Sequence, residues 1–245
     1  MSFSITFLPR FRESEADGLI GVKGYVNYFQ DIASGHFHSL GKGNDTLPYQ
    51  YGVAWVYSKY KLKIYRKTDF SEDISLTSWV SKLDPVRVWQ EMEIRRGDEL
   101  LCEGRLESCL VNLKEAKLVK TPAIELPEEL EEPRLTSVER FSRRMKFDDR
   151  AALAYRYTVR YTDLDNNRHM NNLHYVELFL NAFAPEFHDQ NFITDFELQY
   201  ISQAYCGDEL SVYLYSQADS HTLYAMNQKD ELIAGCKLTV IGNGE

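Results

Sequence analysis

Apolar residues recur with the spacing of an α-helix in two segments of the chain. In residues 25–40 they fall three or four positions apart, and Gly41 follows them. In residues 173–183 (LHYVELFLNAF) they cover nearly every side; the pair Asn171–Asn172 could cap the start, and Pro185 follows the end. The first pattern predicts a helix with one buried face that glycine terminates, and the second predicts a helix enclosed by other elements.

Other segments alternate apolar and polar residues with a period of two, which predicts β-strands with one buried face. Residues 105–110 and 210–215 show this alternation. So do residues 56–65, where three lysines lie opposite a mainly apolar face: Lys59, Lys61 and Lys63 against Val56, Ser58, Tyr60, Leu62 and Ile64. One-sided strands are typical of an antiparallel sheet that covers a core on one face.

The chain contains an internal repeat. Residues 60–76 (YKLKIYRKTDFSEDISL) align without a gap to residues 196–212 (FELQYISQAYCGDELSV), and further on residues 97–100 (GDEL) match residues 229–232 (KDEL). A helical stretch precedes each aligned block, so each half consists of a loop, a helix and several strands. We therefore predict the α+β class and a tandem (double) hot-dog, in which each half is an antiparallel sheet wrapped around a long central helix.

The repeat predicts three parts: an N-terminal hot-dog repeat over residues 1–120, a linker over residues 121–152 and a C-terminal hot-dog repeat over residues 153–245. Three prolines and a run of glutamates interrupt regular structure in the linker. We interpret it as a solvated connection between the halves, with a short basic helix over residues 138–146.

Composition and charge narrow the function classes. The 245 residues include 28 basic and 37 acidic side chains, a net charge of −9, which argues against nucleic-acid binding and against an anionic membrane surface. No apolar run reaches the roughly 20 residues of a membrane-spanning helix, and the first residues lack the features of a signal peptide. The four cysteines contain no C-x-x-C pair, which indicates free thiols and a cytoplasmic protein. We expect Cys206 to be packed in the interior.

Polar residues gather just before the second predicted helix, where residues 160–172 read RYTDLDNNRHMNN. Asp165, Asn167 and His169 alternate in this stretch, so in an extended loop all three side chains point to one side. Free N–H groups at a helix start can also stabilise an oxyanion. The corresponding place in the first half, residues 16–24 (ADGLIGVKG), contains neither asparagine nor histidine. This difference indicates that only the second half keeps a catalytic site.

The sequence shows no pattern for metal or cofactor chemistry. Its six histidines lack cysteine or carboxylate partners at metal-ligand spacing, and there is neither a glycine-rich phosphate loop nor a G-x-S-x-G nucleophile motif. We therefore predict neither a metal site nor a bound cofactor.

The string DLDNNRHMNNLHY resembles the D-x-N-x-H signature of the acyl-acyl-carrier-protein thioesterases, a family of double hot-dog enzymes that release fatty acids from their carrier. Residues 53–56 (VAWV), 73–80 (DISLTSWV) and 107–112 (ESCLVN) resemble other stretches of that family, so the likeness spans nearly the whole chain. The resemblance implies a thioester hydrolase in which the three alternating residues of the loop are catalytic.

The resemblance further implies a substrate and a partner. The substrate is a fatty acyl chain on the phosphopantetheine arm of an acyl carrier protein, and aromatic residues of the first half, such as Phe29, Phe37 and Trp55, hold much of that chain. Because the carrier is acidic and this chain is acidic as well, binding requires a local cationic area. Two candidate areas are present: Arg140, Arg143, Arg144 and Lys146, and the strand face with Lys59, Lys61 and Lys63.

One position departs from the family pattern. The family places a glutamate, often followed by cysteine, on the strand that faces the catalytic loop, where this chain has Gln203 and Ala204. Gln203 can position a water molecule or a carbonyl group, but it cannot accept a proton near neutral pH. We therefore predict direct hydrolysis in which His169 or Asp165 activates the water and Asn167 orients the water or the carbonyl. In this mechanism, N–H groups at the helix start stabilise the oxyanion.

Two other interpretations stay open. The first is an acyl-coenzyme A thioesterase or a hydratase of the same fold. The second is an acyl-binding module without catalytic activity, which the glutamine at position 203 makes reasonable. The sequence does not determine the preferred chain length, the choice between carrier protein and coenzyme A as acyl donor, or whether two chains form a homodimer.

Overall fold

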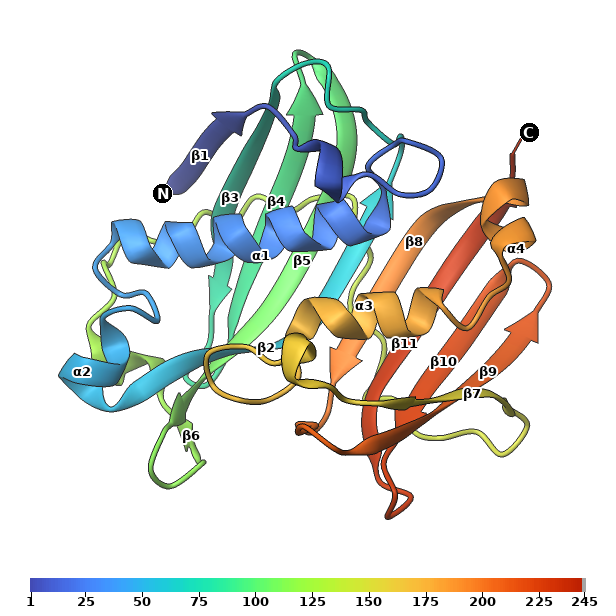
Figure 1. Ribbon diagram of the computed structural model, residues 1–245. Helices are drawn as coiled ribbons and strands as arrows, with labels where there is room; N and C mark the ends of the chain where they lie inside the picture. Colours follow the sequence, from blue (N-terminus) through green and yellow to red (C-terminus); the bar gives the residue numbers. More distant parts are fainter. Residues whose placement is uncertain (244–245) are drawn as a thin grey trace. The chain divides into compact units, whose positions relative to one another are not determined.

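A computed structural model of the protein describes residues 1–243 and divides the chain into two compact units. The first unit comprises Met1–Glu139, and the second begins at Arg140. Figure 1 shows them in blue to green and in yellow to red. The junction falls inside the segment 121–152 that we predict as a linker, and the domain limits derived from the repeat stay a prediction.

The first unit is an antiparallel sheet with one long helix on its face. Its long strands, in the order in which they pair, are β1 (Ser2–Phe7), β3 (Ile74–Leu83), β4 (Val88–Arg96), β5 (Glu99–Asn112) and β2 (Val53–Ile64). The short strand β6 (Leu118–Val119) pairs with β5. Helix α1 (Val22–Ser39) lies across this sheet, and the smaller helix α2 (Leu47–Tyr51) follows it (Figure 1).

Helix α1 confirms the first predicted helix, including the glycine at its end. Gly41 has a φ of 67°, and its N–H donates to the His38 carbonyl at 2.9 Å. The Lys42 N–H donates to the Phe37 carbonyl, also at 2.9 Å. A left-handed residue at this place satisfies the last carbonyls of the helix, and glycine adopts that conformation without a steric penalty.

The second unit repeats this arrangement. Its antiparallel strands pair in the order β8 (Asn191–Tyr200), β11 (Leu232–Gly242), β10 (Ser220–Met226), β9 (Glu209–Gln217) and β7 (Ala152–Thr158). Helix α3 (Asn172–Leu180) lies across the sheet, and the short helix α4 (Pro185–Gln190) follows it (Figure 1). This order equals that of the first unit, with β8 in the place of β2 and β9 to β11 in the places of β3 to β5. The predicted α+β tandem hot-dog is confirmed.

Helix α3 is shorter than predicted. The Asn171 side chain caps its start by accepting the Leu173 N–H at 2.9 Å. The helix ends at Leu180 rather than at Phe183, and Pro185 starts α4 instead of terminating α3. Proline fits the first turn of a helix because its missing N–H has no partner there in any case.

A β-bulge in β2 changes which side chains face the core. Pairing with β5 shifts register between Tyr57 and Lys59, so Ser58 is an extra residue. Tyr60 and the apolar residues that alternate after it are buried as predicted, but Val56 is 40% exposed. The sequence pattern assumes an unbroken period of two, and one extra residue reverses the faces beyond it.

Strand β5, in the interior of the first unit's sheet, is buried on both faces. Arg105 and Glu107 alternate with the apolar residues of β5 as predicted, yet both are buried. Nε of Arg105 lies 2.6 Å from Oε1 of Glu91, and Nη1 of Arg87 lies 3.0 Å from Oε1 of Glu107. Buried charges persist in proteins where partners neutralise and hydrogen-bond them. The chain that follows the sheet supplies further partners and covers this face.

Residues 121–139 pack against the first unit rather than extending into solvent. The N–H and hydroxyl of Thr136 donate to the buried carboxylate of Glu91. Those of Ser137 donate to the buried carboxylate of Glu103. These donors replace the water that the two carboxylates lose on burial. The segment is thus held against the sheet at these contacts, while most of its residues, including Glu128, Glu129 and Glu131, are exposed as expected of a solvated connection.

In the second unit, too, an irregular segment donates hydrogen bonds to buried polar side chains of the sheet, and this segment is formed by the first residues of the unit. The Ser142 N–H and hydroxyl donate to Oε1 of Glu197 at 2.9 and 2.7 Å, and the Met145 N–H donates to Oε1 of Gln199 at 3.0 Å. These N–H groups bind side chains of β8 instead of carbonyls of their own segment. The chain is irregular over residues 138–146, so the predicted basic helix does not form.

All four cysteines are free thiols. Cys206 is exposed on the segment after β8, which corrects the expectation that it is packed; the other three are buried. Among residues 1–243, no helix combines the length and the apolar character that crossing a bilayer requires. Within the same residues, no group of three or more histidine, cysteine or acidic side chains could hold a metal ion.

Candidate functional site

The predicted catalytic residues lie on a loop that closes on itself before helix α3. The loop follows the 3₁₀ turn η3 (Tyr161–Asp163). The Asp165 N–H donates to the His169 carbonyl at 2.9 Å. Two residues further out on each side, the Asn171 N–H donates to the Asp163 carbonyl at 2.8 Å. These two bonds hold the loop as a compact turn at the start of the helix.

This turn brings Asp165 and His169 together. Oδ2 of Asp165 lies 3.4 Å from Nδ1 of His169, and the two side chains are 21% and 22% exposed. The contact arises because the chain reverses: the Arg168 N–H donates to the Asp165 carbonyl at 3.1 Å, and Arg168 has a φ of 64°. The loop is therefore not extended, so the expected arrangement, in which alternating residues of an extended loop point to one side, is wrong. Asp165 and His169 meet across a turn instead.

Asn167 stands at the tip of the same turn. Its N–H donates to Oδ1 of Asp165 at 2.8 Å, and the residue is exposed. The Asp165 carboxylate thus receives the Asn167 N–H on one oxygen and faces the His169 ring with the other. A carboxylate beside Nδ1 favours the tautomer with a proton on that nitrogen, which leaves Nε2 as the basic nitrogen.

Gln203 lies on the segment between β8 and β9, just beyond the end of the strand on which the sequence placed it. This segment runs beside the loop: the Met170 N–H donates to the Ala204 carbonyl at 2.8 Å, and His169 forms an antiparallel bridge with Tyr205. Gln203 is exposed, and its Oε1 accepts the Tyr205 hydroxyl at 2.8 Å. The structure thus places the backbone near Gln203 against that of His169.

Asp163 anchors the loop, although the sequence did not single it out. Its carboxylate is buried, and Oδ2 accepts both the Arg160 N–H and the Tyr157 hydroxyl at 2.7 Å. Burial, followed by the contact with this carboxylate, raises the pKa of Tyr157 to about 12, so the phenol stays a donor at neutral pH. The sequence feature that could have indicated this role is the acidic residue three positions after Arg160, which is the spacing of a capping residue at a turn.

The first unit contains a counterpart of this loop with other side chains. Before α1, the Glu15 N–H donates to the Leu19 carbonyl at 2.7 Å, as Asp165 does to His169. Gly18 has a φ of 79° and provides the left-handed turn position. The backbone of the loop belongs to the fold, and the side chains on it differ between the units.

Lys67 aligns with Gln203 in the internal repeat. Nζ of Lys67 lies 2.6 Å from Oε2 of Glu15 and 2.9 Å from Oδ2 of Asp17. These carboxylates occupy the positions that Asp165 and Asn167 have in the loop of the second unit. In the first unit, the side chain at this position therefore reaches the loop.

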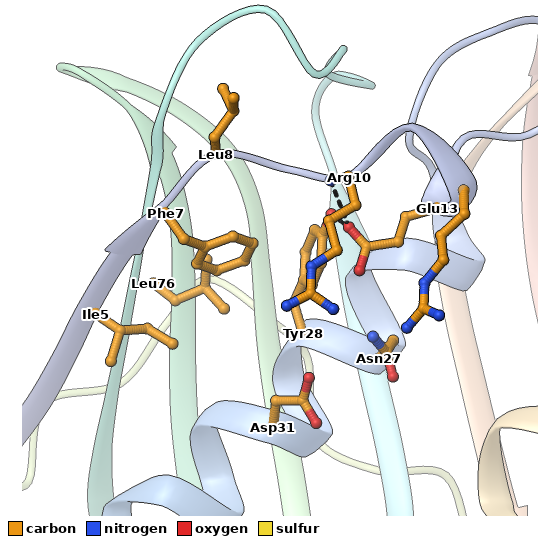
Figure 2. A pocket seen from close by; sticks show the side chains of 10 residues that line it. Ile5, Phe7, Leu8, Arg10, Glu13, Asn27, Tyr28, Asp31 and Leu76 are labelled. Carbon is orange, nitrogen blue, oxygen red and sulfur yellow. Dashed lines mark hydrogen bonds between the residues drawn. The ribbon is translucent and has the colours of Figure 1, made fainter.

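A groove of ≈ 540 Å³ opens in the first unit beside α1 (Figure 2). Its apolar side comes from β1 and β3, and its polar side comes from α1 and the turn before it. The apolar side chains include Ile5, Phe7 and Leu76, and the charged ones Arg10, Arg12, Glu13 and Asp31. The Tyr28 hydroxyl donates to Glu13 at 2.7 Å. Both signs of charge share the rim of this groove.

The aromatic residues that the resemblance linked to the acyl chain are packed in the core of the first unit. The rings of Phe37 and Trp55 stack with their centroids 4.5 Å apart, and the Trp55 indole N–H donates to the Lys42 carbonyl at 2.9 Å. Phe29 is fully buried and fills the space that a side chain at Gly104 would need. The groove beside α1 is lined by other residues.

Comparisons with known families and proteins match both halves of the chain. The acyl-ACP thioesterase N-terminal domain matches residues 1–123, and the acyl-ACP thioesterase C-terminal domain matches residues 147–243. The chain is 27% identical over 221 residues to a chloroplastic acyl-[acyl-carrier-protein] hydrolase of Cuphea viscosissima, and equally to a chloroplastic palmitoyl-acyl carrier protein thioesterase of Cuphea hookeriana. These matches cover 84% of this chain but 53% and 52% of the two relatives, so the chain spans about half of their length.

Solved structures show the same fold. An acyl-ACP thioesterase from Bacteroides thetaiotaomicron superposes with a TM-score of 0.88 at 20% identity, covering 98% of both chains. A 12:0-ACP thioesterase from Umbellularia californica superposes with a TM-score of 0.83 at 18% identity, covering 99% of this chain and 98% of the other. At such identities the likeness concerns the tandem arrangement of the fold.

Proposed function

Because this chain belongs to the acyl-ACP thioesterase family, we propose that it hydrolyses fatty acyl-acyl-carrier-protein to a free fatty acid and the carrier thiol. The observation that carries the proposal is the contact between Asp165 and His169 in the loop before α3. An oriented imidazole beside a partly exposed turn can take a proton from water, which is what direct thioester hydrolysis needs.

His169 is the base in this mechanism. Asp165 has the Asn167 N–H on one oxygen and the His169 ring beside the other, so it orients the imidazole. Nε2 of His169 takes a proton from water as the water oxygen attacks the thioester carbonyl carbon. The tetrahedral intermediate expels the thiolate, which receives the proton from the imidazolium. The products are the fatty acid and the free thiol.

Asn167 and Gln203 complete the proposed site through their amide groups. Two of the helix-start N–H groups that we expected to stabilise the oxyanion are already bound: the Leu173 N–H by the Asn171 side chain at 2.9 Å, and the His174 N–H by the Asn171 carbonyl at 3.0 Å. Side-chain amides are therefore better placed for this role. In the proposed site, Asn167 orients the attacking water and Gln203 contacts the substrate carbonyl.

We propose that the acidic carrier docks on the exposed basic residues of the irregular segment that opens the second unit, namely Arg140, Arg143, Arg144 and Lys146. The lysine face of β2 is less suited. Lys61 is only 13% exposed and lies 3.6 Å from Glu139, and Lys63 lies over the Tyr65 ring. Complementary charge at an exposed segment mainly speeds encounter with a charged partner.

The two halves have different roles in this proposal. Residues 153–245 provide the catalytic loop, residues 1–120 hold the acyl chain, and residues 121–152 connect them. The difference between the two equivalent loops supports this division. The second loop carries Asn167 and His169 where the first has an aspartate and a leucine.

Thiol release from matched substrates separates the proposal from its alternatives. Acyl-carrier-protein and acyl-coenzyme A thioesters of one chain length are compared, and free thiol is followed with a thiol reagent in the Cys206→Ser background, which removes the exposed cysteine. A higher kcat/KM for the carrier thioester supports the proposal, and a higher one for coenzyme A favours an acyl-coenzyme A thioesterase. Hydration of an enoyl thioester without thiol release would indicate a hydratase. Acyl-chain binding without any turnover would indicate a binding module.

A further inference from the structure

Tyr205 holds the side-chain amide of Gln203 in one orientation. The Tyr205 hydroxyl donates to Oε1 of Gln203 at 2.8 Å. A glutamine amide has an acceptor end and a donor end. Because the phenol occupies the acceptor end, the Nε2 donor is the end that Gln203 presents to a ligand.

The backbone of Tyr205 is fixed next to His169. The two residues form an antiparallel bridge, and the bond beside the bridge runs from the Met170 N–H to the Ala204 carbonyl at 2.8 Å. In such a pair the side chains lie on the same face and close to each other. Gln203 stands two residues earlier on the same segment, and its bond to the Tyr205 hydroxyl shows that it shares this face.

A tight turn keeps Tyr205 in this place. Its N–H donates to Oδ2 of Asp208 at 2.8 Å, and the Asp208 N–H donates to its carbonyl at 3.0 Å. The turn is tied to the end of β7 because the Gly207 N–H donates to the Val159 carbonyl and the Val159 N–H donates to the Asp208 carbonyl, both at 2.9 Å. The hydroxyl that orients the glutamine is thus carried by a well-anchored backbone.

The first unit shows where a side chain at this position reaches. Lys67, at the place of Gln203, contacts Glu15 and Asp17 on the equivalent loop at 2.6 and 2.9 Å. Because the two loops share their backbone hydrogen bonds, we expect the side chain at the same position in the second unit to face the loop before α3.

We propose that Gln203 donates a hydrogen bond from Nε2 to the thioester carbonyl oxygen as it becomes an oxyanion, and that Tyr205 is the residue that positions this donor. The inference rests on the proposed hydrolase function. A glutamate at this place would turn a negative oxygen toward the developing charge, whereas the amide turns an N–H toward it. Tyr205 is a positioning residue because its hydroxyl acts through Gln203.

A double-mutant cycle between Tyr205→Phe and Gln203→Leu tests this coupling, with kcat and KM measured for acyl-carrier-protein hydrolysis. We expect Gln203→Leu to lower kcat about 100-fold and Tyr205→Phe to lower it about tenfold. KM should stay within about twofold in both, because the donor acts in the transition state. In the Gln203→Leu background, Tyr205→Phe should have no further effect, since the group that it positions is gone.

Two results would overturn the proposal. The first is an equal loss from Tyr205→Phe in both backgrounds, and the second is a Gln203→Leu variant with a changed KM and an unchanged kcat. Tyr49→Phe is the matched control, because it removes an exposed hydroxyl on α2 of the first unit and should change neither constant. If the wild-type protein releases no thiol, the proposed function fails; if it is active but the cycle shows no coupling, only this inference fails.

Gln203→Glu gives an independent test that preserves the size of the side chain and the bond to Tyr205. An ionised carboxylate cannot donate to an oxyanion, but a protonated one can. We therefore expect the rate of Gln203→Glu relative to the wild type to rise as the pH falls toward the usual glutamate pKa, roughly 4.3. A relative rate that is constant or rises with pH would mean that an acid at this position is harmless or acts as a base, and would overturn the donor role.

Discussion

Glu15 and Asp165 occupy the same position in the two units: each donates its backbone N–H to the carbonyl of the residue four places further on, Leu19 and His169, at 2.7 and 2.9 Å. One loop backbone thus carries two sets of side chains. In the first unit the loop forms an ion-pair cluster with Lys67. In the second unit it brings a carboxylate to an imidazole. The same backbone hydrogen bonds thus accommodate an ion-pair cluster in one unit and a carboxylate–imidazole contact in the other.

Lys67→Met should destabilise the first unit without affecting catalysis. Nζ of Lys67 bridges Glu15 and Asp17, and its side chain is largely shielded from solvent. Without it, two neighbouring carboxylates lose their common partner. We expect the free energy of unfolding in urea to fall by about 1–3 kcal/mol, while kcat per folded molecule is unchanged. The exposed Lys114→Met is the control and should change stability by less than about 0.5 kcal/mol. A fall in kcat per folded molecule would contradict the claim that the loop of the first unit has no part in catalysis.

Asp163→Ala should loosen the catalytic loop. The substitution leaves the Arg160 N–H and the Tyr157 hydroxyl without the oxygen that both now bind. We expect a loss of about 2 kcal/mol in the free energy of unfolding and faster amide hydrogen exchange at Asn171, whose N–H binds the Asp163 carbonyl. Tyr157→Phe removes only one donor and should cost about 1 kcal/mol. Unchanged exchange in Asp163→Ala would show that the carboxylate does not anchor the loop.

Acidification should destabilise the first unit through His36. Burial lowers the pKa of His36 from 6.5 to about 4, and its ring stacks with those of Phe3 and Phe37. In the unfolded chain the imidazole takes a proton near pH 6.5, but in the folded chain it does so only near pH 4. The unfolded state therefore binds more protons across this window and gains stability as the pH falls. The expected loss is about 3 kcal/mol, complete below pH 4.

Urea unfolding of His36→Phe at several pH values isolates this effect. Carboxyl groups contribute equally to the pH dependence of unfolding in both proteins. The difference between the two free energies of unfolding therefore reports the protonation of the His36 imidazole. The free energy of unfolding of the variant should fall less steeply than that of the wild type between pH 6.5 and about 4. Parallel pH profiles would contradict the burial of a neutral His36.

Charge reversal in the basic segment should weaken carrier binding selectively. Arg143→Glu and Arg144→Glu should each raise KM for the acyl-carrier-protein about fivefold at low salt, and less at high salt because of screening. Hydrolysis of the small substrate acyl-pantetheine should not change. Lys229→Glu, on the turn between β10 and β11, is the control. Equal effects on both substrates would mean that the segment does not bind the carrier.

The tandem fold could be predicted because its signals are local. The periodicity around Tyr25, the capping asparagines and the repeated blocks each specify an element regardless of its neighbours. The errors arose where one residue or a distant segment changed the pattern. An extra Ser58 placed Val56 in solvent. Thr136 binds a buried carboxylate, so the segment that carries it is fixed to the sheet although most of its residues are exposed.

The candidate site could be predicted by residue type but not by geometry. Asp165 and His169 are predicted because polar residues cluster before the second helix while the first half has no histidine there. The turn at Arg168 that joins them depends on a left-handed residue that the sequence pattern does not indicate. Asp163 and Tyr205 were missed because their roles come from hydrogen bonds to other segments. Spacing within one loop contains no information on such contacts.

The most direct measurement is the rate of thiol release from acyl-carrier-protein by His169→Ala relative to the wild type, at saturating substrate and pH 8. A general base of this kind contributes about 10²–10⁴-fold. We therefore expect the variant to lose at least about 100-fold in kcat while its thermal unfolding stays unchanged. Release at the wild-type rate would mean that His169 takes no proton from the attacking water, which contradicts the central claim.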